Sequence, residues 1–137
     1  PGAPTVKTPS GLKYTDVTIG QGDPPPAGAQ VTIDYVMAAA AGRFGFSVID
    51  RTKDHEGPFT FKLDDPSIIA GLQEGVSTMR AGGVRRLVIP GALSYTDQSK
   101  TPSPSTFVNY QLYKNYFFNP NLPLKPDLIV DVKLFKF

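Results

Sequence analysis

The most informative stretch of the chain is residues 68–90, which read IIAGLQEGVSTMRAGGVRRLVIP. Apolar side chains recur in its first half at about helical spacing, which predicts a short helix with one buried stripe: Ile69, Leu72, Val76 and Met79. Two adjacent glycines at positions 82 and 83 then indicate a turn. Residues 84–89 are mostly apolar and stop at Pro90, so we expect a strand there.

Alternation of apolar with polar or small residues predicts further strands on both sides of this unit. The expected strands span residues 12–19, 31–37, 43–49, 59–63 and 128–135. Residues 38–42, four alanines and a glycine, interrupt the pattern; because a run so short cannot nucleate a helix alone, we expect a hairpin end there. Several strands with one short helix indicate an α+β domain, in which a curved antiparallel β-sheet wraps around the helix.

The length of 137 residues fits one domain with a self-sufficient core. We place it at residues 10–137, because residues 1–9 carry three prolines and little that could pack, which is typical of a flexible N-terminal arm. The chain begins without methionine or an apolar signal core, as expected of a mature or trimmed terminus. It has no run of 18 apolar residues, so no membrane-spanning segment is expected.

Composition argues against several kinds of chemistry. The net charge is only +2, which disfavours a dedicated nucleic-acid binder, and in a strand Arg85 and Arg86 would point to opposite faces. Cysteine is absent, which removes disulfides, thiolate catalysis and zinc–sulfur sites. The one histidine, His55, lies in the polar run 51–57 and is interpreted as a solvent-facing loop residue. We therefore expect no metal site, no cofactor and no hydrolytic triad.

A segment of 32 residues, 96–127, separates Tyr95 from the last expected strand and is called the insert below. It holds five prolines and six of the fifteen aromatic residues: Phe107, Tyr110, Tyr113, Tyr116, Phe117 and Phe118. Their spacing predicts a short helix, with Ser105 or Thr106 as its N-cap. Two interpretations stay open: the insert covers its own sheet, or these aromatic residues form a docking surface for a protein partner.

Several short segments, in this order and spacing, closely resemble the FKBP family of prolyl isomerases. The matching segments are residues 10–14 (SGLKY), 31–35, 58–63, the helix within 68–79, 87–90 and 131–134. The resemblance implies the fold described above, with a pocket between the start of the helix and the sheet. It also implies that proline-containing protein segments are the ligands.

The resemblance assigns pocket roles to particular residues. It makes Tyr95, Asp50 and Ile69 the candidate catalytic residues: the Tyr95 hydroxyl and the Ile69 backbone N–H donate to the ligand, and Asp50 organises the polar rim. The candidate substrate-binding residues are Tyr35, Ile49, Phe59, Ile68, Leu72 and Val130. Such a pocket needs no nucleophile, because a dry apolar trough with a few donors favours the twisted X–Pro amide over the planar one.

Three pocket positions depart from the family pattern. Ile49 and Val130 stand where phenylalanine is common, and Leu72 stands where active members usually have tryptophan. Each loss of aromatic surface is expected to cost on the order of 1 kcal/mol. Together the three losses predict binding or turnover weaker by roughly tens- to hundreds-fold, since ~1.4 kcal/mol is a factor of ten. The resemblance thus predicts a weak isomerase and leaves catalysis itself open.

Within the family, the chain is most similar to the plant and algal FKBP-like proteins of the thylakoid lumen. Residues 35–42, 82–87 and 89–91, Leu72 and the long segment before the last strand carry this similarity. It implies a location in the chloroplast thylakoid lumen and a role in assembling photosynthetic complexes. The alternative is a non-catalytic interaction module or auxiliary subunit of a photosynthetic thylakoid membrane complex. A generic chaperone would use the same surfaces and stays open as well.

Overall fold

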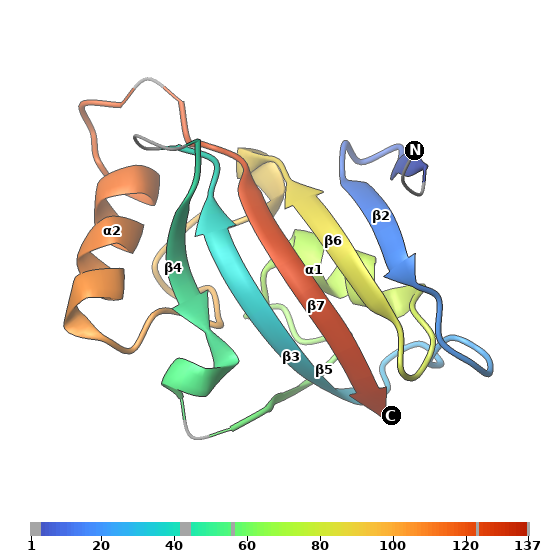
Figure 1. The fold of residues 1–137 in the computed structure, drawn as a ribbon. Coiled ribbons are helices and arrows are strands. Elements are labelled where there is room, and N and C mark those ends of the chain that lie inside the picture. The colour runs from blue at the N-terminus through green and yellow to red at the C-terminus, as the bar shows by residue number, and fades with distance from the viewer. Residues whose placement is uncertain (1–3, 42–44, 56, 123, 137) are drawn as a thin grey trace.

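A computed structural model describes residues 4–41, 45–55, 57–122 and 124–136. Its elements are β1 (Thr5–Lys7), β2 (Lys13–Thr18), β3 (Gln30–Ala39), β4 (Ser47–Arg51), η1 (Thr52–Asp54), β5 (Phe59–Lys62), α1 (Ala70–Ser77), β6 (Val84–Ile89), η2 (Gly91–Leu93), α2 (Phe107–Phe117) and β7 (Leu128–Lys136). The strands form one antiparallel sheet in the order β1-β2-β6-β7-β3-β4, and β5 pairs with β3 (Figure 1). The predicted α+β class is confirmed.

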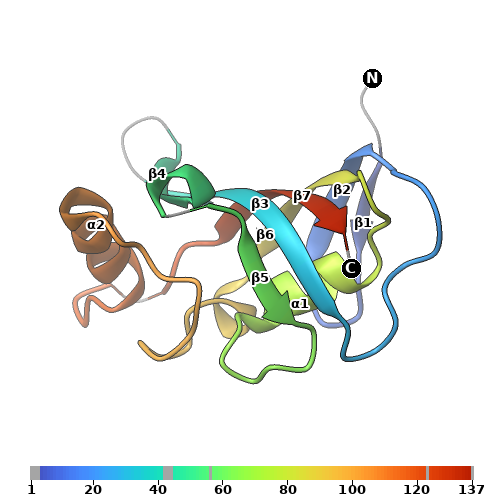
Figure 2. The same ribbon diagram turned by 90° about the horizontal axis from the view of Figure 1, so that it is seen from below.

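The core lies between α1 and the concave face of the sheet, as Figure 2 shows from below. Alternate residues of β3 point into it because successive side chains of a strand face opposite ways. α1 presents Leu72 and Val76 to the sheet, as its periodicity predicted. Met79 is also buried, although it follows the end of the helix.

The start of the chain, the alanine run and the return strand after it differ from expectation. Thr5–Lys7 pair with β2 as an edge strand, so a flexible arm over residues 1–9 is wrong for this part, and residues 1–3 lie outside the described residues. β3 continues through Ala39, because its backbone stays paired with β7 that far. The return strand begins at Ser47 rather than at position 43, and residues 42–44 lie outside the described residues.

Strand β6 carries two adjacent arginines whose side chains lie on opposite faces of the sheet. Arg85 points inward and is buried; its guanidinium donates to Asp16 of β2 at 2.7 Å and to the Gly75 carbonyl of α1 at 2.9 Å. Arg86 points outward and pairs with Asp131 at 2.7 Å. The prediction that the two arginines face opposite sides is confirmed. Arg85 links β6 to β2 and to α1 through these hydrogen bonds.

The insert forms α2, which lies beside β4 at the edge of the sheet (Figure 1). Thr106 caps it by accepting a hydrogen bond from the Asn109 backbone N–H at 3.2 Å, as predicted. α1 and α2 have 8 and 11 residues and are too short to span a bilayer. The described part of the chain has no other α-helix, and so none that could span a membrane.

Candidate functional site

An open cavity of about 500 Å³ lies beside β3, between the turn after β4 and the insert. Its lining comes from three parts of the chain: Tyr35 of β3; Thr52, His55, Gly57, Pro58 and Phe59 around η1 and β5; and Thr101, Pro102 and Ser103 of the insert. The Phe59 ring meets the Tyr35 ring edge-on, with centroids 6.2 Å apart. The cavity therefore combines an apolar aromatic wall with a small number of polar groups.

A buried carboxylate, that of Asp50, contacts two residues that line this cavity, Tyr35 and His55. Asp50, fully buried, accepts a hydrogen bond from the Tyr35 hydroxyl at 2.6 Å. Burial raises the pKa of the Asp50 carboxyl, and its hydrogen bonds with Tyr35 and His55 oppose that rise only in part. Burial likewise raises the pKa of Tyr35, and the bond to Asp50 raises it further, so the tyrosine stays a proton donor.

His55 belongs to the same network, contrary to its interpretation as a solvent-facing residue. Its Nε2 lies 2.8 Å from one Asp50 oxygen and 3.1 Å from the other. The turn η1 makes this contact possible, because it folds the chain back within five residues and the His55 N–H closes it on the Thr52 carbonyl. In the sequence, this contact is indicated only by the short spacing between Asp50, a predicted site residue, and His55, the one histidine.

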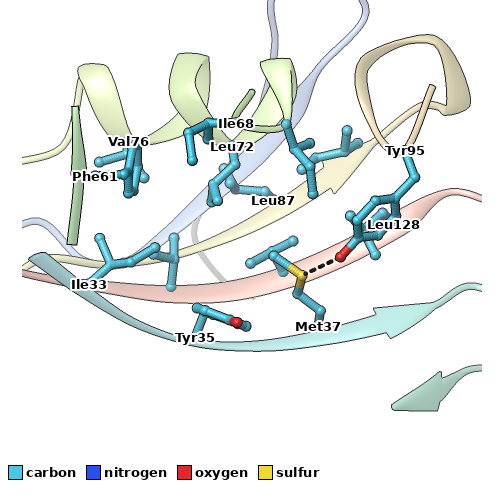
Figure 3. Close-up of a cluster of buried hydrophobic side chains, with 14 of the residues drawn as sticks. Ile33, Tyr35, Met37, Phe61, Ile68, Leu72, Val76, Leu87, Tyr95 and Leu128 are labelled. Atoms are coloured by element: carbon cyan, nitrogen blue, oxygen red, sulfur yellow. Dashed lines mark hydrogen bonds between the residues drawn. The ribbon is translucent and has the colours of Figure 1, made fainter. Parts of the chain in front are cut away.

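The second half of the site lies where α1 begins. The Ile69 backbone N–H donates to the Thr101 carbonyl at 3.0 Å. The Tyr95 hydroxyl donates to the Pro102 carbonyl at 2.5 Å and lies 3.5 Å from the Met37 sulfur; Figure 3 shows it pointing at Met37. The two predicted donors therefore do converge, but both act on the chain's own insert. Tyr95 is fully buried, and this burial raises its pKa.

The predicted substrate-binding residues divide into two groups. Tyr35 and Phe59 line the open cavity. The other four are buried in the core and do not line it: Ile49, Ile68, Leu72 and Val130. Residues 101–103 line the cavity instead, and the backbone of Thr101 pairs with Ile68 and accepts from the Ile69 N–H. For these four side chains, direct contact with a ligand in this state of the pocket is ruled out by burial.

The aromatic residues of the insert also divide. Tyr113 and Phe117 pack on Tyr95, with ring centroids 4.7 and 5.3 Å away, and are buried. A docking role for these two is therefore wrong, because their rings complete the domain's own core. Tyr116 and Phe118 are partly buried against the core, whereas Phe107 and Tyr110 are exposed. Burial raises the pKa of Tyr113 to about 12.

Solved structures define the class of domain. The crystal structure of AtFKBP13 matches with a TM-score of 0.69 at 23% identity, over 98% of this chain and 100% of that one. The N-terminal domain of FKBP42 from Arabidopsis thaliana matches with a TM-score of 0.71 at 18% identity, over 98% and 92%. At these identities the likeness concerns the fold alone, and the fold is that of an FKBP domain.

Sequence comparison then gives the family. The model of the FKBP-type peptidyl-prolyl cis-trans isomerase family matches residues 22–134, and the chain belongs to this family. Peptidyl-prolyl cis-trans isomerase FKBP16-3, chloroplastic, of Arabidopsis thaliana is 40% identical over 92 residues, which cover 67% of this chain and 40% of that protein. FKBP17-1, chloroplastic, is 39% identical over 119 residues, covering 80% and 50%. The chain thus spans about half the length of these relatives or less.

Proposed function

We propose that this domain is a weak peptidyl-prolyl cis-trans isomerase that acts on X–Pro bonds of client proteins. One observation carries the proposal: two donors, the Ile69 N–H and the Tyr95 hydroxyl, converge on the carbonyls before and after a buried proline ring. A site that holds its own Thr-Pro segment in this way has the donors and the apolar surroundings for an X–Pro segment of another protein.

The chemistry would rest on the environment of the amide. Rotation about the X–Pro bond loses resonance, with a barrier of ~18–20 kcal/mol. An apolar site disfavours the more polar planar amide, and donors fixed beside the rotating carbonyl stabilise the twisted form without reorganising. Asp50 supports this arrangement by holding the Tyr35 hydroxyl at the cavity wall. We attribute a low activity to Ile49, Leu72 and Val130, because these buried aliphatic side chains supply no aromatic wall for a client proline.

The test is an exchange measurement by NMR on a short X–Pro peptide, with and without the protein. We expect acceleration by the wild type and a loss of at least about tenfold in Tyr95→Phe, because one donor to the substrate is removed. Tyr110→Phe is the matched control, since Tyr110 lies exposed on α2 and should keep wild-type activity. A wild-type protein that neither binds nor accelerates any X–Pro peptide contradicts the proposal.

For location, we propose the chloroplast, and within it the thylakoid lumen. The support is the set of relatives from Arabidopsis thaliana whose names carry the word chloroplastic. Expression of the complete coding sequence as a fluorescent fusion in plant cells, followed by thylakoid fractionation, tests it. Signal recovered from the stroma or from outside the chloroplast contradicts the proposal.

A second candidate function is that of an interaction module. Phe107 and Val108 on α2 are 68% and 71% exposed. They line a shallow hollow of about 530 Å³ together with Gln111, Leu112 and Asn115. Exposed apolar side chains grouped in this way favour docking of a protein segment, here of a photosynthetic membrane complex.

This candidate is tested by co-purification from thylakoid membranes. The double change Phe107→Ser and Val108→Ser is expected to abolish association with the membrane complex while isomerase activity stays unchanged. Lys114→Ala, on an exposed position of the same helix, is the control. Association that survives the double change, or that is absent in the wild type, contradicts a docking role for this hollow.

A further inference from the structure

Residues 100–105 of the insert cross the site, and they are called the strap below. At the first end of the strap, the Lys100 ammonium donates to the Pro66 carbonyl at 2.7 Å and the Thr101 N–H donates to the Ser67 carbonyl at 2.8 Å. At the other end, the Ser105 hydroxyl donates to the Asp54 carbonyl at 2.9 Å. The strap therefore spans from the turn before α1 to the turn after β4.

The middle of the strap makes the contacts expected of a ligand. The Thr101 and Pro102 carbonyls accept from Ile69 and Tyr95, the two donors that the proposed function assigns to a client. The Pro102 ring is buried. Because each donor has one hydrogen to give, a client carbonyl and a strap carbonyl compete for it. The Thr101–Pro102 peptide bond is cis.

We propose that the strap is an internal ligand of the pocket, and that a proline-containing client binds by displacing residues 101–103. This proposal rests on the proposed function of the site. Displacement is feasible because the hydrogen bonds at both ends of the strap lie at exposed positions, where water can replace them. The open cavity walled by Tyr35, His55 and Phe59 adjoins the strap and offers a client its first contacts.

This competition sets the ratio between the apparent and the intrinsic Kd of a client, which can be measured. The apparent Kd of a client equals its intrinsic Kd divided by the fraction of molecules whose strap is open. A strap closed in about 90 to 99% of molecules therefore raises the apparent Kd about ten- to hundred-fold. Weakening the strap lowers the Kd by that factor, whereas it would raise the Kd if residues 101–103 were merely part of the binding wall.

The experiment measures binding of a fluorescent peptide with the sequence of residues 98–105, Gln-Ser-Lys-Thr-Pro-Ser-Pro-Ser. Its Kd is compared among the wild type, Pro102→Ala and the matched control Pro120→Ala, which changes an exposed proline of the same insert. We expect Pro102→Ala to bind about ten- to hundred-fold more tightly than the wild type, and Pro120→Ala to bind like the wild type. Equal or weaker binding by a folded Pro102→Ala variant overturns the proposal.

A second measurement uses the wild type alone and decides the case if Pro102→Ala fails to fold. Hydrogen exchange of the Thr101 amide, bonded to Ser67, is followed by NMR with and without saturating peptide. Loss of protection on binding supports displacement. Unchanged protection while the peptide binds overturns the strap proposal and leaves the proposed function standing. If the peptide binds neither the wild type nor Pro102→Ala, the strap proposal and the proposed function are both overturned.

Discussion

At the residue scale, Asp50 is fully buried between the Tyr35 hydroxyl and the His55 ring, both of which line the cavity. The place of Tyr35 in β3 and of Asp50 in β4 could be predicted, because both occupy family positions in recognisable strands. That of His55 could not, because a lone histidine in a polar run has no periodic context. Its contact arises from the turn η1, and the direction of a turn depends on hydrogen bonds that the sequence does not display.

The first prediction concerns the pH dependence of stability at Asp50. Its pKa is raised above the ordinary value of 3.8 in the folded state, so the folded protein binds this proton more tightly than the unfolded chain. The corresponding stability is fully present below pH 3.8 and is lost as pH rises through the folded pKa. The free energy of unfolding of the wild type, minus that of Asp50→Asn, should therefore fall with rising pH in denaturant titrations.

The control repeats both proteins with His55→Gln, because the His55 ring is titratable and lies within hydrogen-bond distance of Asp50. A difference that instead rises with pH up to about 3.8 and then levels off would mean that the pKa of Asp50 is lowered in the folded state. That result would contradict the account of this network.

At the element scale, α1 approaches β6 so closely that a side chain at either of two helix glycines would meet a side chain of the strand. A Cβ on Gly71 would lie 2.5 Å from Ile89 Cγ2, and one on Gly75 would lie 2.5 Å from Leu87 Cδ2. Periodicity could predict the helix and its buried stripe, yet it gives no separation between helix and sheet. The two glycines lower helix propensity, and tertiary packing more than offsets this.

The second prediction is that Gly71→Ala destabilises the domain by about 1–3 kcal/mol, although alanine is the better helix former. The obstacle is the stiff β-branched side chain of Ile89, three of whose atoms lie within 3.2 Å of the added methyl. Gly75→Ala is the matched control and should cost less, because the tip of Leu87 can turn away. Thermal or denaturant unfolding measures both, and a stabilised Gly71→Ala variant would contradict the close approach.

The third prediction concerns the start of α2. Thr106→Ala removes the oxygen that accepts from the Asn109 N–H, so it should lower the free energy of unfolding by about 1 kcal/mol. Thr106→Ser keeps that oxygen and should stay near the wild type. Both are measured by denaturant unfolding, together with hydrogen exchange of the Asn109 amide. Equal stability and exchange in the three proteins would show that the cap contributes nothing.

At the scale of the whole molecule, the order and type of the strands from β2 onward and of the two α-helices could be predicted, because periodicity and family segments report on them. The strap could not, since residues 100–105 have no period and their position depends on contacts with residues 54, 66, 67, 69 and 95. The strap leads directly into the N-cap of α2, so the pocket and the insert are joined through a short backbone connection. Long-range hydrogen bonds of this kind become visible only in the folded chain.

The fourth prediction concerns Arg85, which links β6 to β2 and α1. Arg85→Ala should destabilise the domain by about 2–3 kcal/mol, because it removes charged hydrogen bonds from a buried position. Arg86→Ala is the matched control on the next residue of the strand: its pair with Asp131 is exposed and worth at most about 1 kcal/mol. Denaturant unfolding measures both. Equal losses would contradict a structural role for the buried arginine.

The measurement that tests the central claim most directly is a crystal structure of the wild-type domain with a bound X–Pro peptide. The account predicts that the peptide carbonyl before the proline accepts from the Ile69 N–H, that the carbonyl after it accepts from the Tyr95 hydroxyl, and that residues 101–103 have moved away. A peptide bound elsewhere on the domain, with Thr101 and Pro102 still on these two donors, would contradict it.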